Sequence, residues 1–345
     1  MKLGMPLSYA GGFKEAARQA ADLESAGLDM VWVAEAYGFD GVSFMGYLAA
    51  ITERVEIAAG ILPIYTRTPT LLAMTAAGVD ALSDGRCVLG LGASGPQVIE
   101  GWHGIVYDKP LQRTREIVDI CRAVWRRERV SYDGQAYHLP LPDGQGTGLG
   151  KPLKLITRPV RERIPIYVAA LGPKNVAMTA EVADGWLPAF FDPAKAKDVW
   201  GDDLAAGAAK RSPDLGPLDI AISGMVAVGE DAAMLRDLAR PLLALYIGGM
   251  GARGRNFYND LACRYGYEAE AKEVQDLYLD GKKDEAARAV PAELVEATTL
   301  CGPEGYIRER LAAHKEAGVT VMNLTPVATD IPALVGQLKQ WMEDA

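Results

Sequence analysis

The chain has 345 residues, of which 49% are hydrophobic and 23% are charged. These values are typical of globular proteins and exclude disordered and fibrous classes. The net charge is −9 and no basic run is longer than Arg126-Arg127, so we expect no nucleic-acid partner, because nucleic-acid binders carry a basic face. No uncharged apolar run approaches the roughly 18 residues that cross a membrane, so we expect no membrane partner either.

Cysteine and histidine usage bears on the compartment and on metal binding. The cysteines are Cys87, Cys121, Cys263 and Cys301. They are far apart and form no CxxC pair, which favours a reducing cytoplasm over a disulfide scaffold. The histidines are His103, His138 and His314. None is spaced to share a metal ion with another, so we expect no metal site.

Apolar runs alternate with helical patterns along most of the chain. The expected strands cover residues 2–7, 30–34, 55–61, 87–92, 165–171, 185–190, 218–228 and 320–325. The expected helices cover residues 13–26, 43–51, 69–82, 111–125, 174–183, 193–210, 232–247, 303–317 and 331–343. The strands are continuous apolar runs, as a parallel sheet covered by helices requires.

Eight strand-and-helix units predict an α/β fold, a closed (β/α)8 TIM barrel that forms a single domain over residues 1–345. An open doubly wound sheet is the alternative, and closure is favoured because it removes the sheet edges. No GxGxxG follows the first strand, which argues against a dinucleotide-binding open sheet. Two segments fall outside the pattern, at about 130–163 and about 248–300, and we expect them to be insertions.

In such a barrel the functional residues lie where the strands end. Glu35 ends the second strand, and it is either a helix-start or loop charge or a ligand contact that accepts a hydrogen bond or takes a proton. Glu100 and His103 follow a glycine-rich run after the fourth strand. His103 is either an exposed loop residue or an acid–base group. The residues alone leave both pairs of alternatives open.

Glycines and arginines indicate where a flat or anionic ligand could approach. Gly60 and Gly92 end the third and fourth strands and leave the backbone open to a ring or a phosphate. Gly172-Pro173-Lys174-Asn175 opens a helix after the fifth strand; a helix N-terminus attracts anions, but a plain helix start explains it equally well. Arg253 and Arg255 lie among glycines and either clamp an anion or belong to a solvated loop.

These strand ends resemble those of the luciferase-like monooxygenase superfamily, in the branch that uses coenzyme F420, a 5-deazaflavin, and that includes methylenetetrahydromethanopterin reductase. The matching stretches are Lys2-Leu3-Gly4, AGLDMVWVAEAY (26–37), GILPIYTRTPTLLAM (60–74), LSDGRCVLGLGASGPQVIEGWHG (82–104) and PIYVAALGPKNVAMTAEVADGWLP (165–188). They follow the family's order and together cover about half of the chain.

The resemblance implies a deazaflavin at the barrel mouth and a non-prolyl cis peptide at Gly60-Ile61 that backs its central ring. The implied cofactor contacts are Glu35, Gly60, Ile61, Gly92, Ala93, Ser94, Gln97, Ala170, Leu171, Gly172, Pro173 and Asn175. Many relatives carry a histidine directly after the acid that ends the second strand, and this chain has Ala36 there. Catalytic proton transfer must therefore be sought elsewhere, and the candidates are Glu35, Tyr65, Glu100 and His103.

The implied activity is that of an oxidoreductase, with hydride transfer between F420 and a small organic substrate, for which Arg253 and Arg255 are the candidate contacts. An FMN-dependent monooxygenase of the same superfamily is the alternative, and a flavin-binding barrel without activity is a third possibility. The shortage of histidines argues against a metal-dependent barrel hydrolase. The resemblance also implies a homodimer, since barrels of this family often dimerise.

Overall fold

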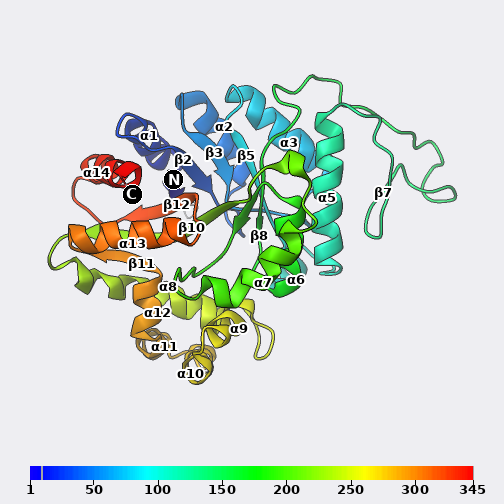
Figure 1. Cartoon of the computed structure of the whole chain (residues 1–345). Helices are drawn as coiled ribbons and strands as arrows, with labels where there is room; N and C mark the ends of the chain where they lie inside the picture. Colours follow the sequence, from blue (N-terminus) through cyan, green and yellow to red (C-terminus); the bar gives the residue numbers. More distant parts are fainter. Residues whose placement is uncertain (9–10, 345) are drawn as a thin grey trace.

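The structure, a computed structural model, describes residues 1–8 and 11–344. Eight parallel strands form a closed barrel at its centre, with helices packed around the outside (Figure 1). The ring closes because β1 (Lys2–Leu7) pairs with β2 (Met30–Val33) on one side and with β12 (Val321–Pro326) on the other. The predicted (β/α)8 TIM barrel is therefore confirmed, and the open sheet is excluded.

The strand positions follow the apolar runs of the sequence. Between β2 and β12 the barrel contains β3 (Glu56–Ala59) with β4 (Leu62–Pro63), β5 (Cys87–Gly92), β8 (Ile166–Ala169), β9 (Gly185–Leu187) and β10 (Asp219–Val228). β3 and β4 share one barrel position, because the backbone leaves the ladder between them at Gly60-Ile61.

Helices cover the outer face of the barrel. They are α1 (Phe13–Glu24), α2 (Gly41–Ile51), α3 (Pro69–Leu82), α5 (Pro110–Trp125), α6 (Pro173–Val182), α7 (Ala196–Ala208), α13 (Glu304–Glu316) and α14 (Ile331–Asp344). Thr68 caps α3 with its hydroxyl oxygen and Pro69 opens it, so the loop after β4 ends at a well-defined helix start.

The core has two layers, because alternate residues of a buried strand point inward and outward. The outward residues pack against the helices in one large apolar cluster. The residues that form the separate inner cluster are Met30, Trp32, Ala58, Val88, Tyr167, Ala221 and Val321. The interior of the barrel is thus filled at this level, which leaves its open ends for a ligand.

Two parts of the barrel wall differ from the sequence-based expectation. The predicted helix 232–247 is wrong as one α-helix: it consists of the 3₁₀ segment η2 (Ala232–Ala239), α8 (Arg240–Ala244) and the π-turn η3 (Leu245–Gly249). Pro241 has no N–H to donate and so interrupts the α-helical pattern. The short helix α4 (Pro96–Gly101) forms where we expected only a loop.

The segment 248–300 is helical over much of its length, as its sequence predicts in part. It contains α9 (Phe257–Arg264), α10 (Glu268–Leu279), α11 (Lys283–Ala289) and α12 (Ala292–Ala297). At its end an unexpected strand, β11 (Thr299–Gly302), pairs in parallel with β10 beside the barrel. In Figure 1 these helices form a separate group next to α8.

The segment 130–163 begins with a short hairpin, β6 (Tyr132–Asp133) and β7 (His138–Leu139). The buried Glu116 carboxylate on α5 fixes this hairpin, because it accepts hydrogen bonds from the N–H groups of Gln135, Ala136 and Tyr137. The irregular chain after the hairpin extends away from the body beyond α5 (Figure 1).

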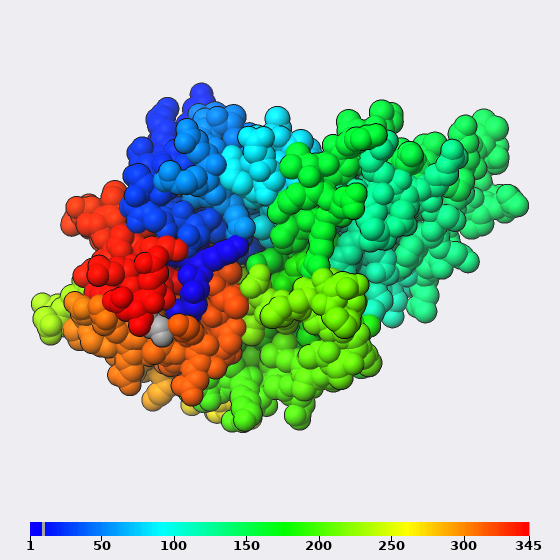
Figure 2. Space-filling view, turned by 45° about the horizontal axis from the view of Figure 1, so that its top comes forward, coloured from blue at the N-terminus to red at the C-terminus, as the bar shows by residue number. Residues whose placement is uncertain are grey.

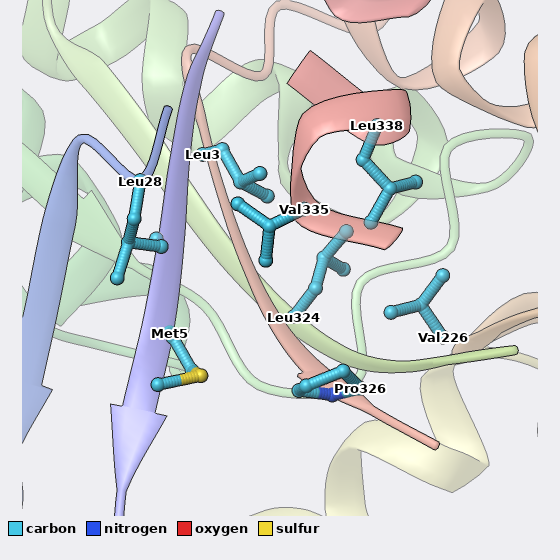
Figure 3. A pocket seen from close by; sticks show the side chains of 9 residues that line it. Leu3, Met5, Leu28, Val226, Leu324, Pro326, Val335 and Leu338 are labelled. Carbon is cyan, nitrogen blue, oxygen red and sulfur yellow. The ribbon is translucent and has the colours of Figure 1, made fainter. Parts of the chain in front are cut away.

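One small gap remains between the barrel and α14. Its volume is about 10 Å³, and its lining is apolar, from Leu3, Met5, Leu324, Val335 and neighbouring residues (Figure 3). A space of this size holds at most one water molecule, and without polar partners it stays dry. It is therefore a packing gap and not a ligand site. The described helices are all too short or too polar to cross a membrane.

His314 provides a test of the core that depends on pH. It is 1% exposed on α13, its Nδ1 atom lies 2.7 Å from the carbonyl oxygen of Arg310, and burial lowers its pKa from 6.5 to about 4. The folded chain therefore holds a neutral imidazole, while the unfolded chain binds a proton once the pH falls below 6.5. The resulting stability is complete above pH 6.5 and is lost as the pH falls towards 4.

We expect this residue to make the free energy of unfolding of the wild type fall by roughly 2–3 kcal/mol more than that of His314→Gln between pH 7 and pH 4.5. Urea unfolding at the two pH values measures the difference. Equal losses for the wild type and His314→Gln would contradict the expectation.

Candidate active site

The mouth of the barrel is shaped by a cis peptide between Gly60 and Ile61. This bond lies between β3 and β4, and the predicted non-prolyl cis peptide is therefore confirmed. The indole of Trp32 lies close to it, since a Cβ atom on Gly60 would be 3.3 Å from Trp32 Cε3. The bulge thus lies against a rigid aromatic side chain of the barrel interior.

Glycines on β5 make room for this bulge. A Cβ atom on Gly90 would lie 1.7 Å from the carbonyl oxygen of Ala59, so no other residue fits there. One on Gly92 would lie 2.8 Å from Cγ1 of Ile61, so the Ile61 side chain covers the end of β5. Ala93 and Ser94 follow at the same rim, and both are half-buried. The predicted contacts Gly60, Ile61, Gly92, Ala93 and Ser94 thus come together, whereas Gln97 is exposed on α4.

Glu35, beyond the end of β2, is held in a nearly buried ion pair. Its two carboxylate oxygens accept hydrogen bonds of 2.6 and 2.8 Å from the Arg67 guanidinium, and the N–H of Gly41 adds a third at 2.8 Å. The side chains of Arg67 and Glu35 are only 13% and 10% exposed. Arg67 also contacts Asp40, which caps α2. The Glu35 carboxylate raises the pKa of Arg67, so the guanidinium stays charged.

Of the two roles that we predicted for Glu35, this pairing favours that of a charge at the start of a helix over that of a group that exchanges a proton. Both oxygens already have strong, charge-assisted partners, so the carboxylate is fixed rather than available for proton exchange. Its place at the mouth suits a residue that positions the loop between β2 and α2.

The other three candidate catalytic residues differ in their partners. The hydroxyl of Tyr65 donates to the carbonyl oxygen of Asp108 at 2.8 Å, and burial raises the Tyr65 pKa far above its usual value. Glu100 is exposed and accepts a hydrogen bond from the N–H of Tyr107. His103 is half-buried after α4, and its ring has no hydrogen bond within the described residues. Of these groups, the His103 imidazole is the most available for proton transfer.

Exposed aromatic side chains lie at Trp102, next to His103 in the chain, and in the loop after β2. Trp102 is 68% exposed and its ring lies 6.4 Å from that of Tyr37, which is 67% exposed and comes from the loop after β2. Phe39, in the same loop, is 69% exposed. Large apolar groups grouped in this way at a barrel mouth are typical of a binding surface.

After β8 the chain forms the start of α6. The carbonyl oxygens of Ala170 and Leu171 accept hydrogen bonds from the indoles of Trp186 and Trp200, so this loop is fixed from behind. Gly172 precedes the helix and Pro173 opens it. The side-chain oxygen of Asn175 is buried and has no partner within the described residues. A buried polar atom without a partner at a helix N-terminus indicates a place where a polar ligand group can bind.

The two predicted substrate contacts, Arg253 and Arg255, lie in the loop before α9. Arg253 is paired with Asp276 at 2.9 Å within the same segment, while Arg255 is exposed. The loop is anchored by the buried Asn256, which caps α9 and donates to the carbonyl oxygens of Tyr246 and Ile247. Nothing in these contacts brings the two arginines to the mouth, and their role stays a prediction.

Aromatic residues connect this segment to the barrel instead. The ring of Phe190, after β9, lies 5.6 Å from that of Tyr246 and 5.8 Å from that of Tyr258. Sequence reasoning missed these tyrosines, and it missed Arg67. The sequence does contain a hint of the role of Arg67. β2 and β3 are expected to be neighbours, so the acid Glu35 after β2 can meet a cation in the loop that follows β3 and β4.

The sequence profile of the luciferase-like monooxygenase family matches residues 1–321. This chain belongs to that family. A protein of Mycobacterium tuberculosis named as a coenzyme F420-dependent oxidoreductase is 44% identical to this chain. The match covers 97% of this chain and 99% of the relative. The 5,10-methylenetetrahydromethanopterin reductase of Archaeoglobus fulgidus is 29% identical over 89% of this chain and 88% of its own.

The fold of this luciferase-like chain also matches a solved structure. It superposes on the F420-dependent tetrahydromethanopterin reductase of Methanopyrus kandleri with a TM-score of 0.78 and 20% identity, covering 99% of this chain and 98% of that one. At this identity the likeness establishes the fold of the barrel and leaves the chemistry to the residues at the mouth.

Proposed function

We propose that this chain is an F420-dependent oxidoreductase, which transfers hydride between the deazaflavin and a small organic substrate. The observation that carries the proposal is the 44% identity to an F420-dependent oxidoreductase over nearly the whole of both chains. An FMN-dependent monooxygenase is the second candidate, because the family profile that matches residues 1–321 is that of the luciferase-like monooxygenases.

The residues at the mouth fit a deazaflavin. A flat ring needs a surface without long projecting side chains, and the half-buried Gly60 and Ala93 beside the Gly60-Ile61 bulge offer one. A phosphate needs N–H groups or cations, and the start of α6 offers Lys174 and the amide of Asn175, whose oxygen has no partner among the described residues. Rotating that amide by half a turn would present its NH₂ group, since the two assignments are interchangeable. When bound, the deazaflavin supplies the carbon that accepts or donates hydride.

The polar residues at the mouth then have two roles: one pair positions a loop, and one residue transfers a proton. The Glu35–Arg67 pair holds the loop after β2 at the edge of the ring surface. His103 carries the proton that balances hydride transfer, because its ring is the candidate group that has no competing partner among residues 1–8 and 11–344. A His103→Gln variant that bound deazaflavin and turned over as the wild type does would remove this assignment.

The rim favours a substrate with an apolar part. Trp102, next to His103 in the chain, and Tyr37 present exposed rings that lie 6.4 Å apart, and such rings bind organic molecules with little loss of side-chain entropy. Within the described residues no cluster of His, Cys, Asp and Glu is arranged to hold a metal ion.

The proposal extends to the cellular location and the partners of the enzyme. All four cysteines are free thiols, which supports a reducing, cytoplasmic location. A small molecule is the expected partner. A homodimer is expected as well.

Fluorescence titration tests the choice of cofactor. F420 should bind with a micromolar or lower dissociation constant, because the ring surface and the α6 N-terminus act together. FMN added as a competitor should displace it only at a concentration at least tenfold higher. Tight binding of FMN without binding of F420 would overturn the proposal in favour of the monooxygenase.

A further inference from the structure

The half of the barrel mouth formed by β10 and β12 has exposed hydroxyl groups on its inner face. Ala221 and Val321 on these strands belong to the packed inner cluster. The residues two places later, Ser223 and Asn323, therefore also face inward, and they are direct neighbours in the parallel ladder. Thr325 follows on the same face of β12. Ser223 and Thr325 are nevertheless exposed, so the barrel is open above the packed layer at this place.

This half of the mouth lies across the barrel from the Gly60-Ile61 bulge. Round the closed ring of eight strands, β10 is four positions from β3, and β12 is four positions from β5. A flat ring that lies against the bulge therefore turns its free face towards β10 and β12. In the space-filling view the projecting lobe that contains residues 130–163 lies at the opposite end of the molecule from the orange and red segments that contain β12 (Figure 2). The lobe thus leaves this half of the mouth uncovered.

Several polar groups here have no hydrogen-bond partner within the described residues. Two of them are buried, Trp32 Nε1 and Asn323 Oδ1, on side chains that are 4 and 3% exposed. Both lie over Gly4 of β1, since a Cβ atom there would clash with the Asn323 oxygen and lie 3.0 Å from Trp32 Nε1. The hydroxyls of Ser223 and Thr325 likewise make no hydrogen bond in the described part of the chain. Unpartnered donors and acceptors gathered on neighbouring strands indicate where a polar group binds.

The surroundings of these groups are uncharged. The other inward residues at this level of β1, β2 and β10 are Gly4, Pro6, Trp32 and Met225. The guanidinium of Arg67 at the mouth is already neutralised by Glu35 and Asp40. A charged substrate group would lose its water here without gaining a counter-charge, which is costly. A serine or threonine hydroxyl both donates and accepts, so it suits an uncharged oxygen.

We propose that the Ser223 and Thr325 hydroxyls bind an uncharged oxygen of the substrate, a carbonyl or a hydroxyl, and so hold the carbon that bears it at the free face of the deazaflavin. This inference rests on the proposed F420 function and names the substrate class of that same site. In the direction of reduction, the carbonyl carbon takes the hydride, the C–O double bond becomes a single bond, and the oxygen takes a proton. The electron pair comes from the reduced deazaflavin, which is thereby oxidised. Hydroxyls that donate to the oxygen stabilise the negative charge that it gains on the way.

Two matched probes test this inference on the F420-loaded protein. Cyclohexanone and cyclohexanecarboxylate share an apolar ring, and they differ in whether the oxygen group is neutral or anionic. Saturation-transfer NMR titrations give the dissociation constant of each. We expect cyclohexanone to bind at least about tenfold more tightly than the carboxylate, because the site offers hydroxyls and no cation. Equal or tighter binding of the carboxylate, or no binding of cyclohexanone, would overturn the inference.

Variants assign the preference to the two hydroxyls. Ser223→Ala/Thr325→Val should abolish the preference for cyclohexanone and leave the F420 dissociation constant within about twofold of the wild type. The control Ser25→Ala/Thr147→Val removes two exposed hydroxyls from other positions and should change neither quantity. Thr325→Lys places a cation at the exposed end of β12 and should reverse the preference in favour of the carboxylate.

The outcomes separate this inference from the function on which it rests. A preference for cyclohexanone that survives in Ser223→Ala/Thr325→Val, or that Thr325→Lys leaves unchanged, would contradict the assigned hydroxyls. Binding of F420 by a protein without any preference for cyclohexanone would overturn the substrate class alone. Failure of F420 itself to bind would overturn the proposed function, and the inference with it.

Discussion

Replacing Arg67 by methionine is expected to lower the free energy of unfolding by about 3 kcal/mol or more. Among the described residues, the change leaves the Glu35 carboxylate, which is 10% exposed, with the N–H of Gly41 as its one remaining hydrogen-bond donor. A nearly buried charge without its partner is costly, and the loop between β2 and α2 should loosen to relieve it. We therefore expect F420 to bind at least tenfold more weakly, as measured by fluorescence titration beside urea unfolding.

Two variants separate this effect from a general loss of charge. Arg18→Met breaks an exposed pair with Glu15 and should cost less than about 1 kcal/mol. Glu35→Gln/Arg67→Met removes both charges and should recover part of the stability lost in Arg67→Met. A single variant as stable as the wild type would show that the pair does not hold the loop.

Replacing Gly90 by alanine is expected to be the most damaging single change at the mouth. The new methyl group would lie 1.7 Å from the carbonyl oxygen of Ala59, and neither backbone can move without opening the barrel between β3 and β5. We expect a loss of more than about 4 kcal/mol, or no folded protein. Gly305→Ala on α13 has open space around it and should instead stabilise the chain by about 0.5–1 kcal/mol. Thermal unfolding of both variants measures the contrast, and a Gly90→Ala protein within 1 kcal/mol of the wild type would refute the close contact.

Much of the barrel could be predicted from the sequence, because parallel strands buried on both faces read as apolar runs. All eight barrel strands fall in such runs, and the helices between them were found by their spacing. β11 was missed because its four residues follow a helical stretch without a turn signal. The segment 232–247 was read as one helix because its apolar spacing is helical, although Pro241 interrupts the hydrogen bonds.

The active site could be predicted only in part. The rule that function lies at strand ends selected Glu35, Gly60, Gly92 and Gly172, and the chain brings residues of this kind to one mouth. The rule does not say which side chains pair across loops. For that reason Arg67 was missed as the partner of Glu35, and the hydrogen bond that occupies the hydroxyl of Tyr65 could not be foreseen.

The central claim, that a deazaflavin lies at the carboxyl ends of β3, β5 and β8, is tested most directly by hydrogen–deuterium exchange of the whole chain with and without F420. We predict slower exchange on addition of F420 in residues 59–62, 92–97 and 171–176, with little change in α10 and α11. No change in these three segments, or protection there by FMN and not by F420, would contradict the claim.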